Sequence, residues 1–216
     1  MSDLEANSLF KQFSRFFKPH PWHGIDLKAE GDHLQAYIEM VPTDTVKYEI
    51  DKSTGYLKVD RPQKYSNIIP ALYGFLPKTY SGALSAEYAE SKSGLTDLKG
   101  DGDPIDICVL TEKNFTHGDI ILSARPIGGF RMLDGGEIDD KIIAVLKDDP
   151  LYGEWTNIGN CPKKVVDRLL HYFLTYKEIP GSNEDAKVRV THIYEQQEAR
   201  EVIRAGVDDY RNKFGF

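Results

Sequence analysis

Asp101, Asp103 and Asp106 place three carboxylates within six positions, and they are followed at once by the apolar run Ile107 to Leu110. Carboxylates packed together at neutral pH repel one another, so a compact site built from them needs cations. Mg²⁺ suits such a site, because it takes oxygen ligands, keeps several waters and commonly joins carboxylates to the phosphate oxygens of a substrate. The motif therefore predicts a metal site at the mouth of a buried strand.

The motif alone leaves two other interpretations open. It fits a solvated acidic turn, and it also fits the start of an EF-hand calcium loop, with Asp101, Asp103 and Glu112 at loop positions 1, 3 and 12. An EF-hand needs Gly at position 6, where this chain has Asp106. A second acidic stretch favours the metal site, because residues 134–141 again lead into an apolar strand. Two such strand ends would face one metal cluster.

Length and composition exclude several classes of protein. A chain of 216 residues is long enough for one sizeable core, and we expect a single domain over 25–216 after an N-terminal extension, 1–24. The 27 Lys and Arg against 34 Asp and Glu give a net charge of −7, so nucleic acid is not expected as a partner. Two cysteines without a CxxC pair fit a reducing compartment. With no apolar run of about 20 residues and no signal-peptide core, we expect a cytoplasmic protein with no membrane partner.

The extension 1–24 has apolar residues at helical spacing, among them Leu9, Phe13 and Phe16. This spacing predicts a short amphipathic helix that docks on the domain or on a neighbouring subunit. A membrane-surface anchor and an organellar presequence are the alternatives. His20 and His23 are interpreted as packing or surface residues.

Hydrophobic periodicity predicts the remaining elements. Period-2 alternation indicates a hairpin in which Lys47 and Glu49 point to the same side. A helix opens at Pro162, and a second helix closes the chain. Residues 81–100 are interpreted as a long loop. The predicted strands are 34–41, 46–50, 56–61, 105–110, 118–126, 141–146 and 187–193.

Lys177 extends the apolar stripe of the helix that opens at Pro162, four residues beyond Phe173. Its ammonium would then be carried toward the domain, where a charge needs an anionic partner. The alternative is that the side chain snorkels to solvent at the helix end.

Taken together, these residues resemble the signature of the family I soluble inorganic pyrophosphatases, over roughly residues 34 to 180. The resemblance implies an α+β, mainly β fold, with a five-stranded OB-like closed barrel and flanking α-helices. It implies a Mg²⁺-dependent enzyme, with several ions per active site, that hydrolyses pyrophosphate to two orthophosphates by direct attack of a metal-bridged water. It also implies a homo-oligomer. The bacterial type of this family forms hexamers and the eukaryotic type forms dimers, so the resemblance leaves both assemblies open.

Site residues follow from the resemblance position by position. Asp103 would be the catalytic residue that contacts the nucleophilic water. The metals would be held by Asp101, Asp106, Asp134, Asp139, Glu49 and Glu39. The substrate pyrophosphate would be bound by Lys47, Arg61, Tyr73, Lys141, Tyr176 and Lys177. The chain departs from the family pattern at Ile69 and Leu72, where a tyrosine and an asparagine of the phosphate site are replaced.

Two other functions compete with pyrophosphate hydrolysis: a binding module and a hydrolase of organic pyrophosphates. A non-catalytic OB-type binding module has no use for so many metal-directed carboxylates, and a nucleic-acid binder would need aromatic platforms in a basic groove. The other alternative is a metal-dependent hydrolase of a nucleotide or other organic pyrophosphate. Only the family resemblance argues against it.

Overall fold

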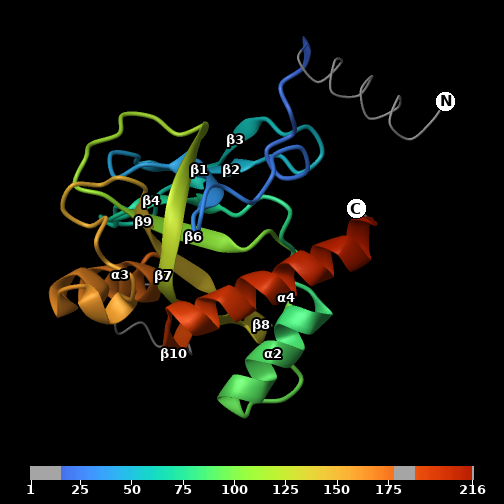
Figure 1. The fold of residues 1–216 in the computed structure, drawn as a ribbon. Coiled ribbons are helices and arrows are strands. Elements are labelled where there is room, and N and C mark those ends of the chain that lie inside the picture. Colours follow the sequence, from blue (N-terminus) through green and yellow to red (C-terminus); the bar gives the residue numbers. More distant parts are fainter. Residues whose placement is uncertain (1–15, 178–187, 216) are drawn as a thin grey trace.

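The chain folds around a small closed ring of five β-strands (Figure 1). The structure, a computed structural model, describes residues 16–177 and 188–215. Strand β7 pairs with both β9 and β1, which closes the ring. This architecture confirms the predicted mainly β fold with an OB-like barrel. In ring order the strands are β1 (Leu34–Met40), β4 (Leu72–Phe75), β6 (Asp106–Leu110), β9 (Lys141–Leu146) and β7 (Ile120–Asp134).

Neighbouring strands in the ring are antiparallel except β6 and β9, which are parallel. Parallel strands need a long connection between them, and here the connection contains β7. Because β6 and β9 run in the same direction, both begin at the same end of the barrel. The two acidic stretches that precede them therefore lie at that end together.

Alternate side chains of β6 enter two different cores. Ile107 and Val109 belong to the core that α4 (Gln196–Phe214) covers, while Cys108 and Leu110 belong to the core that α3 (Lys163–Thr175) covers. A strand buried on both faces reads in the sequence as a continuous apolar run. This explains why the run from Ile107 to Leu110 is unbroken.

The prediction of a long loop at 81–100 is wrong, because this stretch contains helix α2 (Ala83–Ser93) and the short strand β5 (Lys99–Gly100). The helix packs beside α4 (Figure 1). Its first turn is capped from α4, where the carboxylate of Asp209 accepts hydrogen bonds from the N–H groups of Gly82, Leu84 and Ser85. A cap supplied from so far along the chain leaves no signal in the local sequence.

The other elements extend the ring. Strands β2 (Val46–Ile50) and β3 (Leu57–Pro62) form the predicted hairpin as a separate sheet. Strands β8 (Glu137–Ile138) and β10 (Val188–Glu195) pair with the end of β7. Gly129 allows β10 to cross closely, since a Cβ at this position would lie 2.4 Å from the ring of Tyr194. A short 3₁₀ helix, η2 (Ile158–Asn160), precedes α3.

The described part of the N-terminal extension packs on the barrel. Trp22 is buried beside Tyr37, Phe75 and Tyr210, and His23 hydrogen-bonds the Tyr210 hydroxyl at 2.7 Å. The predicted amphipathic helix falls mainly on residues 1–15, outside the described residues, and the domain boundary stays a prediction. None of the helices within 16–177 and 188–215 is long and apolar enough to cross a membrane.

Candidate active site

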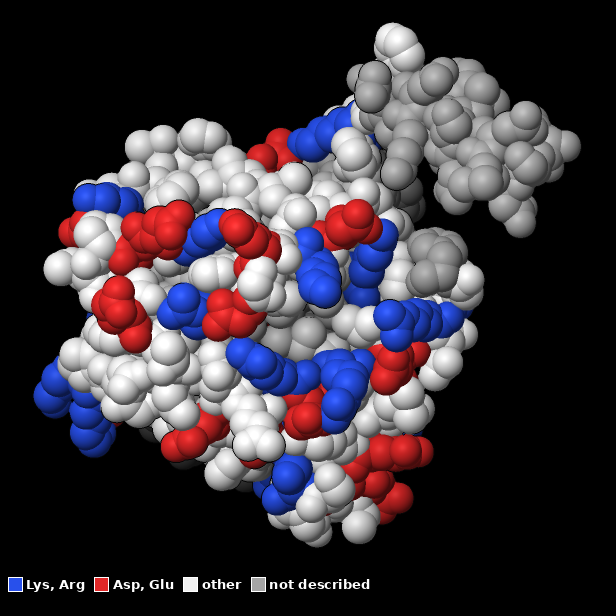
Figure 2. Space-filling model, in the orientation of Figure 1, with Lys and Arg blue, Asp and Glu red and all other residues white. Residues whose placement is uncertain are grey.

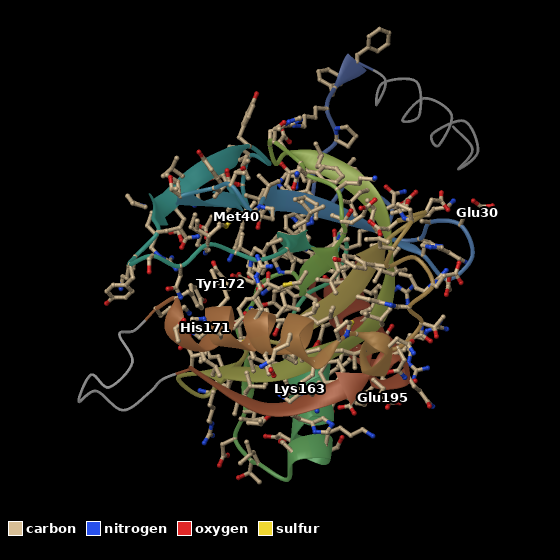
Figure 3. All side chains as sticks on the ribbon, turned by 90° about the vertical axis from the view of Figure 1, so that its left-hand side faces the viewer. Glu30, Met40, Lys163, His171, Tyr172 and Glu195 are labelled. Atoms are coloured by element: carbon tan, nitrogen blue, oxygen red, sulfur yellow. The ribbon has the colours of Figure 1, made fainter. Side chains whose placement is uncertain are left out.

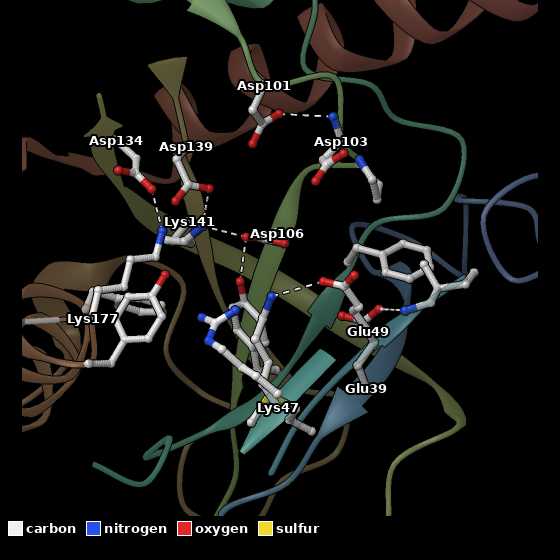
Figure 4. A pocket seen from close by; sticks show the side chains of 18 of the residues that line it. Glu39, Lys47, Glu49, Asp101, Asp103, Asp106, Asp134, Asp139, Lys141 and Lys177 are labelled. Carbon is white, nitrogen blue, oxygen red and sulfur yellow. Dashed lines mark hydrogen bonds and ion pairs between the residues drawn. The ribbon is translucent and has the colours of Figure 1, made fainter. Parts of the chain in front are cut away.

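All thirteen residues assigned from the sequence line one cavity of about 250 Å³ at the end of the barrel where β6 and β9 begin. The close view in Figure 4 shows carboxylates and lysines from separate elements pointing toward one another. The hairpin supplies one wall, the acidic stretches a second, and the end of α3 a third. The thirteen are Glu39, Lys47, Glu49, Arg61, Tyr73, Asp101, Asp103, Asp106, Asp134, Asp139, Lys141, Tyr176 and Lys177.

The loop before β6 is held in a fixed shape by local hydrogen bonds. The Asp101 carboxylate accepts the backbone N–H of Asp103 at 3.0 Å, and the carbonyl of Asp103 accepts the N–H of Ser81 at 2.8 Å. Gly102 has φ 77°, a conformation that glycine adopts without strain. Asp106 is itself the first residue of a strand, so the EF-hand interpretation is wrong.

The parallel register of β6 and β9 sets Asp106 opposite Lys141. The Lys141 ammonium contacts the carboxylates of both Asp106 and Asp139, although only 1% of this lysine is exposed. Its ammonium also lies 5.8 Å from the ring centre of Phe173 on α3. A buried lysine of this kind stays charged because two carboxylates face it. Accordingly, these carboxylates raise its pKa, against the opposing effect of burial.

Other lysines contact three more of these carboxylates. Lys52 contacts Asp103, and Lys177 contacts Asp134. Lys47 lies 3.1 Å from Glu49 and 3.0 Å from Asp60. All three of these lysines line the cavity. Each contacts a carboxylate that is predicted to hold a metal or the attacking water, and Lys47 also contacts Asp60.

The carboxylates that line the cavity outnumber its lysines, so some of them lack a counter-charge. Burial, with repulsion from Asp139 next in importance, raises the pKa of Asp101 to about 7. Burial also raises the pKa of Asp106, partly opposed by Lys141. Glu39 is 6% exposed, and burial raises its pKa to about 8 even though its carboxylate accepts the N–H of Ile50 at 2.6 Å.

These shifts fit a site that receives cations, since added positive charge restores the ionised form of such carboxylates. Oxygen-only donors are also what Mg²⁺ prefers. Within the part of the chain that the structure describes, no three His, Cys, Asp or Glu side chains already surround one point as ion ligands. Instead, lysine ammonium groups contact Asp103, Asp106, Asp134 and Asp139.

Two assigned residues have surroundings that the sequence did not indicate. Lys177 lies beyond the last helical residue of α3, Thr175, rather than on a continued helical stripe, yet its ammonium still reaches the cavity. Tyr73 was assigned to phosphate, but its hydroxyl donates to the Asp106 carboxylate at 2.5 Å.

Three polar residues of the cavity escaped the reading of the sequence: Lys52, Glu137 and Tyr172. Lys52 lies in the hairpin turn, and no local pattern marks it. Tyr172 had a usable signal, because it precedes Tyr176 by four residues and so shares one face of the helix.

A barrel end at which clustered carboxylates meet converging lysines and an arginine defines a metal-dependent phosphoryl-transfer site. Comparison with known proteins agrees. A sequence profile of the inorganic pyrophosphatase family matches residues 36–211. The inorganic pyrophosphatase of Chlamydia muridarum is 56% identical over 199 residues, which cover 90% of this chain and 95% of that protein. Soluble inorganic pyrophosphatase 3 of Arabidopsis thaliana is 35% identical, over 88% of this chain and 78% of that protein.

Solved structures show the same likeness. The inorganic pyrophosphatase of Thermus thermophilus superposes with a TM-score of 0.72 and 26% identity, over 89% of this chain and 99% of that one. The Trypanosoma cruzi vacuolar soluble pyrophosphatase, at 21% identity, shows the fold alone, with a TM-score of 0.77 over 93% of this chain and 81% of that one. The chain belongs to the inorganic pyrophosphatase family. It is a metal-dependent hydrolase of pyrophosphate, as the family resemblance of its sequence implied.

Proposed function

We propose that the cavity hydrolyses pyrophosphate to two orthophosphates with several Mg²⁺ ions, and that the thirteen residues act in the roles assigned above. The observation that carries this proposal is the convergence of all thirteen, from segments spread between Glu39 and Lys177, on one cavity. Pyrophosphate carries several negative charges, so both cations and donors must surround it before a nucleophile can approach.

Asp101, Asp106 and Asp139 would hold the activating metals, and Asp134 with Asp139 would hold the metals that accompany the substrate. Glu49 of the hairpin and Glu39 of β1 would complete the set. When bound, the Mg²⁺ ions would neutralise the phosphates and lower the pKa of the attacking water. The raised pKa values of Asp101 and Glu39 support this assignment, because both carboxyls gain most from an added cation.

The protein's own side chains bind and orient the pyrophosphate and the attacking water. Lys47, Arg61 and Lys177 donate to phosphate oxygens, and they stabilise the charge that develops on the departing phosphate. These three groups contact Asp60, Glu49 and Asp134, and the phosphate oxygens would take the place of these carboxylates. Asp103 accepts the proton of the attacking water. Its carboxylate is 45% exposed and open to the cavity, as this role requires.

Phosphate release tests the proposal directly. Purified protein is incubated with pyrophosphate or with ATP, in Mg²⁺ and again with excess chelator. Release from pyrophosphate in Mg²⁺ alone is the expected result, with Asp106→Asn as the inactive control. Equal release from ATP would instead indicate a hydrolase of organic pyrophosphates. Release from pyrophosphate that persists in chelator would contradict the metal assignment.

We infer a cytoplasmic homo-oligomer in which 25–216 form a single domain. On the face shown in Figure 2, acidic and basic side chains are interspersed, without a continuous area of one sign. Light scattering on a sizing column, at two protein concentrations, measures the assembly; a stable monomer would contradict it.

A further inference from the structure

Tyr172 lies on α3 inside the cavity, and no role follows for it from the sequence motifs. The residue is 6% exposed, and its ring stacks on that of Tyr176, with centroids 5.2 Å apart and an interplanar angle of 16°. Figure 3 shows Tyr172 on the side of α3 that faces the strands, toward Met40, which lines the same cavity. The ring is therefore held in one position by packing.

The hydrogen bonds of the Tyr172 hydroxyl are incomplete. Its oxygen accepts the side-chain N–H of Gln63 at 3.4 Å, and among the described residues no acceptor takes its proton. Tyr73 provides the contrast, since its hydroxyl proton is committed to Asp106. A buried phenol normally finds a partner for its hydroxyl. Tyr172 lines a cavity that has room for an acceptor of this proton.

The surroundings specify the charge of that acceptor. Lys47 and Arg61 line the same cavity from the hairpin, and the positive charge of Lys47 acts on Tyr172. Burial raises the pKa of Tyr172 to about 12, although Gln63 and Lys47 lower it. The hydroxyl thus stays protonated at neutral pH and can only donate its free proton. A donor that shares a cavity with two cations matches an anionic oxygen.

We propose that the Tyr172 hydroxyl donates a hydrogen bond to the phosphate group bound by Lys47 and Arg61, and so binds and orients pyrophosphate. This inference rests on the proposed function of the cavity. It distinguishes two tyrosines of the cavity by their hydroxyl protons: that of Tyr172 has no acceptor among the described residues, whereas that of Tyr73 is donated to Asp106, a carboxylate of the metal set.

Tyr172→Phe tests the inference, because it keeps the stacked ring and removes only the hydroxyl. A hydrogen bond to a charged group contributes enough for a loss of roughly 10-fold in kcat/KM for pyrophosphate. The affinity for inorganic phosphate, measured by calorimetry in Mg²⁺, should fall by a similar factor. The Mg²⁺ concentration for half-maximal activity should stay unchanged in Tyr172→Phe and rise in Tyr73→Phe.

Tyr152→Phe is the matched control. Tyr152 also stacks on an aromatic partner, Trp155, at 4.5 Å, but it lies outside the cavity, and its variant should keep parental kinetics. Parental kcat/KM and phosphate affinity in Tyr172→Phe would overturn the inference, and so would a lowered thermal midpoint with unchanged kinetics. A wild-type protein that does not release phosphate from pyrophosphate would overturn the proposed function itself.

Discussion

Asp106 and Lys141 lie opposite each other on the parallel strands β6 and β9, and the Lys141 ammonium contacts the Asp106 carboxylate. The same ammonium contacts Asp139, and the lysine is almost wholly buried. Lys141 therefore supplies, from within the chain, part of the positive charge that metal ions would add. We therefore expect the stability of this end of the barrel, without metal, to depend on Lys141.

Lys141→Met should destabilise the metal-free protein by about 3–5 kcal/mol, because buried carboxylates lose their counter-charge. Mg²⁺ should restore more stability to this variant than it adds to the parent, since bound cations replace the missing ammonium. Urea unfolding with chelator and with Mg²⁺ measures both quantities. An equal gain from Mg²⁺ in the two proteins would show that Lys141 and the metals do not share these carboxylates.

Asp106→Asn and Asp103→Asn should separate metal binding from water activation. Asp106→Asn removes a charge at the centre of the carboxylate set without changing side-chain volume, so nearly all activity and much of the Mg²⁺ affinity should be lost. Asp103→Asn should retain Mg²⁺ affinity better and lower turnover roughly 10²–10⁴-fold. Circular dichroism checks the fold, and calorimetry measures Mg²⁺ binding. The same loss of Mg²⁺ affinity in both variants would contradict the two roles.

Lys177→Met should lower turnover while changing the free energy of unfolding by less than about 1 kcal/mol, because the ion pair with Asp134 is partly exposed. Arginine at this position should rescue turnover only in part, since its planar group differs in shape from an ammonium. Lys163→Met, on the opposite end of α3, is the control, with 84% of its side chain exposed. Parental kinetics in Lys177→Met would remove this residue from the site.

Glu39→Gln should change how stability depends on pH in the metal-free protein. The ordinary pKa of Glu39 is 4.5, and burial raises it to about 8 in the folded chain. Between these values the folded state keeps a proton that the unfolded chain releases, so this group lowers stability as pH rises from about 5 to about 8. A glutamine stays neutral and can still accept the N–H of Ile50.

The thermal midpoint of Glu39→Gln should therefore match the parent near pH 5 and exceed it by roughly 5 °C near pH 8. Thermal scans in chelator, across this pH range, make the measurement. Glu87→Gln is the control, because Glu87 is exposed on α2. Parallel pH curves for Glu39→Gln and the parent would mean that Glu39 is ionised in the folded protein.

The metal chemistry of the site could be predicted from the sequence because most of its carboxylates lie in two short, continuous segments. Both segments, the aspartate motif that leads into β6 and the acidic stretch before β9, can be recognised by their high content of acidic residues. The apolar runs that follow them predict buried strands, since a strand buried on both faces needs no polar positions. The family resemblance then joined these segments and named the fold. All thirteen residues line one cavity, and the role of each stays a prediction.

Tertiary structure alone decided how distant segments meet. Asp106 faces Lys141 only because β6 and β9 are parallel neighbours, and strand pairing depends on the burial of a shared core rather than on local pattern. Helix α2 was missed because its cap, Asp209, comes from α4. The Tyr73 and Tyr172 hydroxyls also differ in their hydrogen bonds because of the tertiary structure. Whether a hydroxyl finds an acceptor depends on which strand or loop lies opposite, and this cannot be predicted from the residue type.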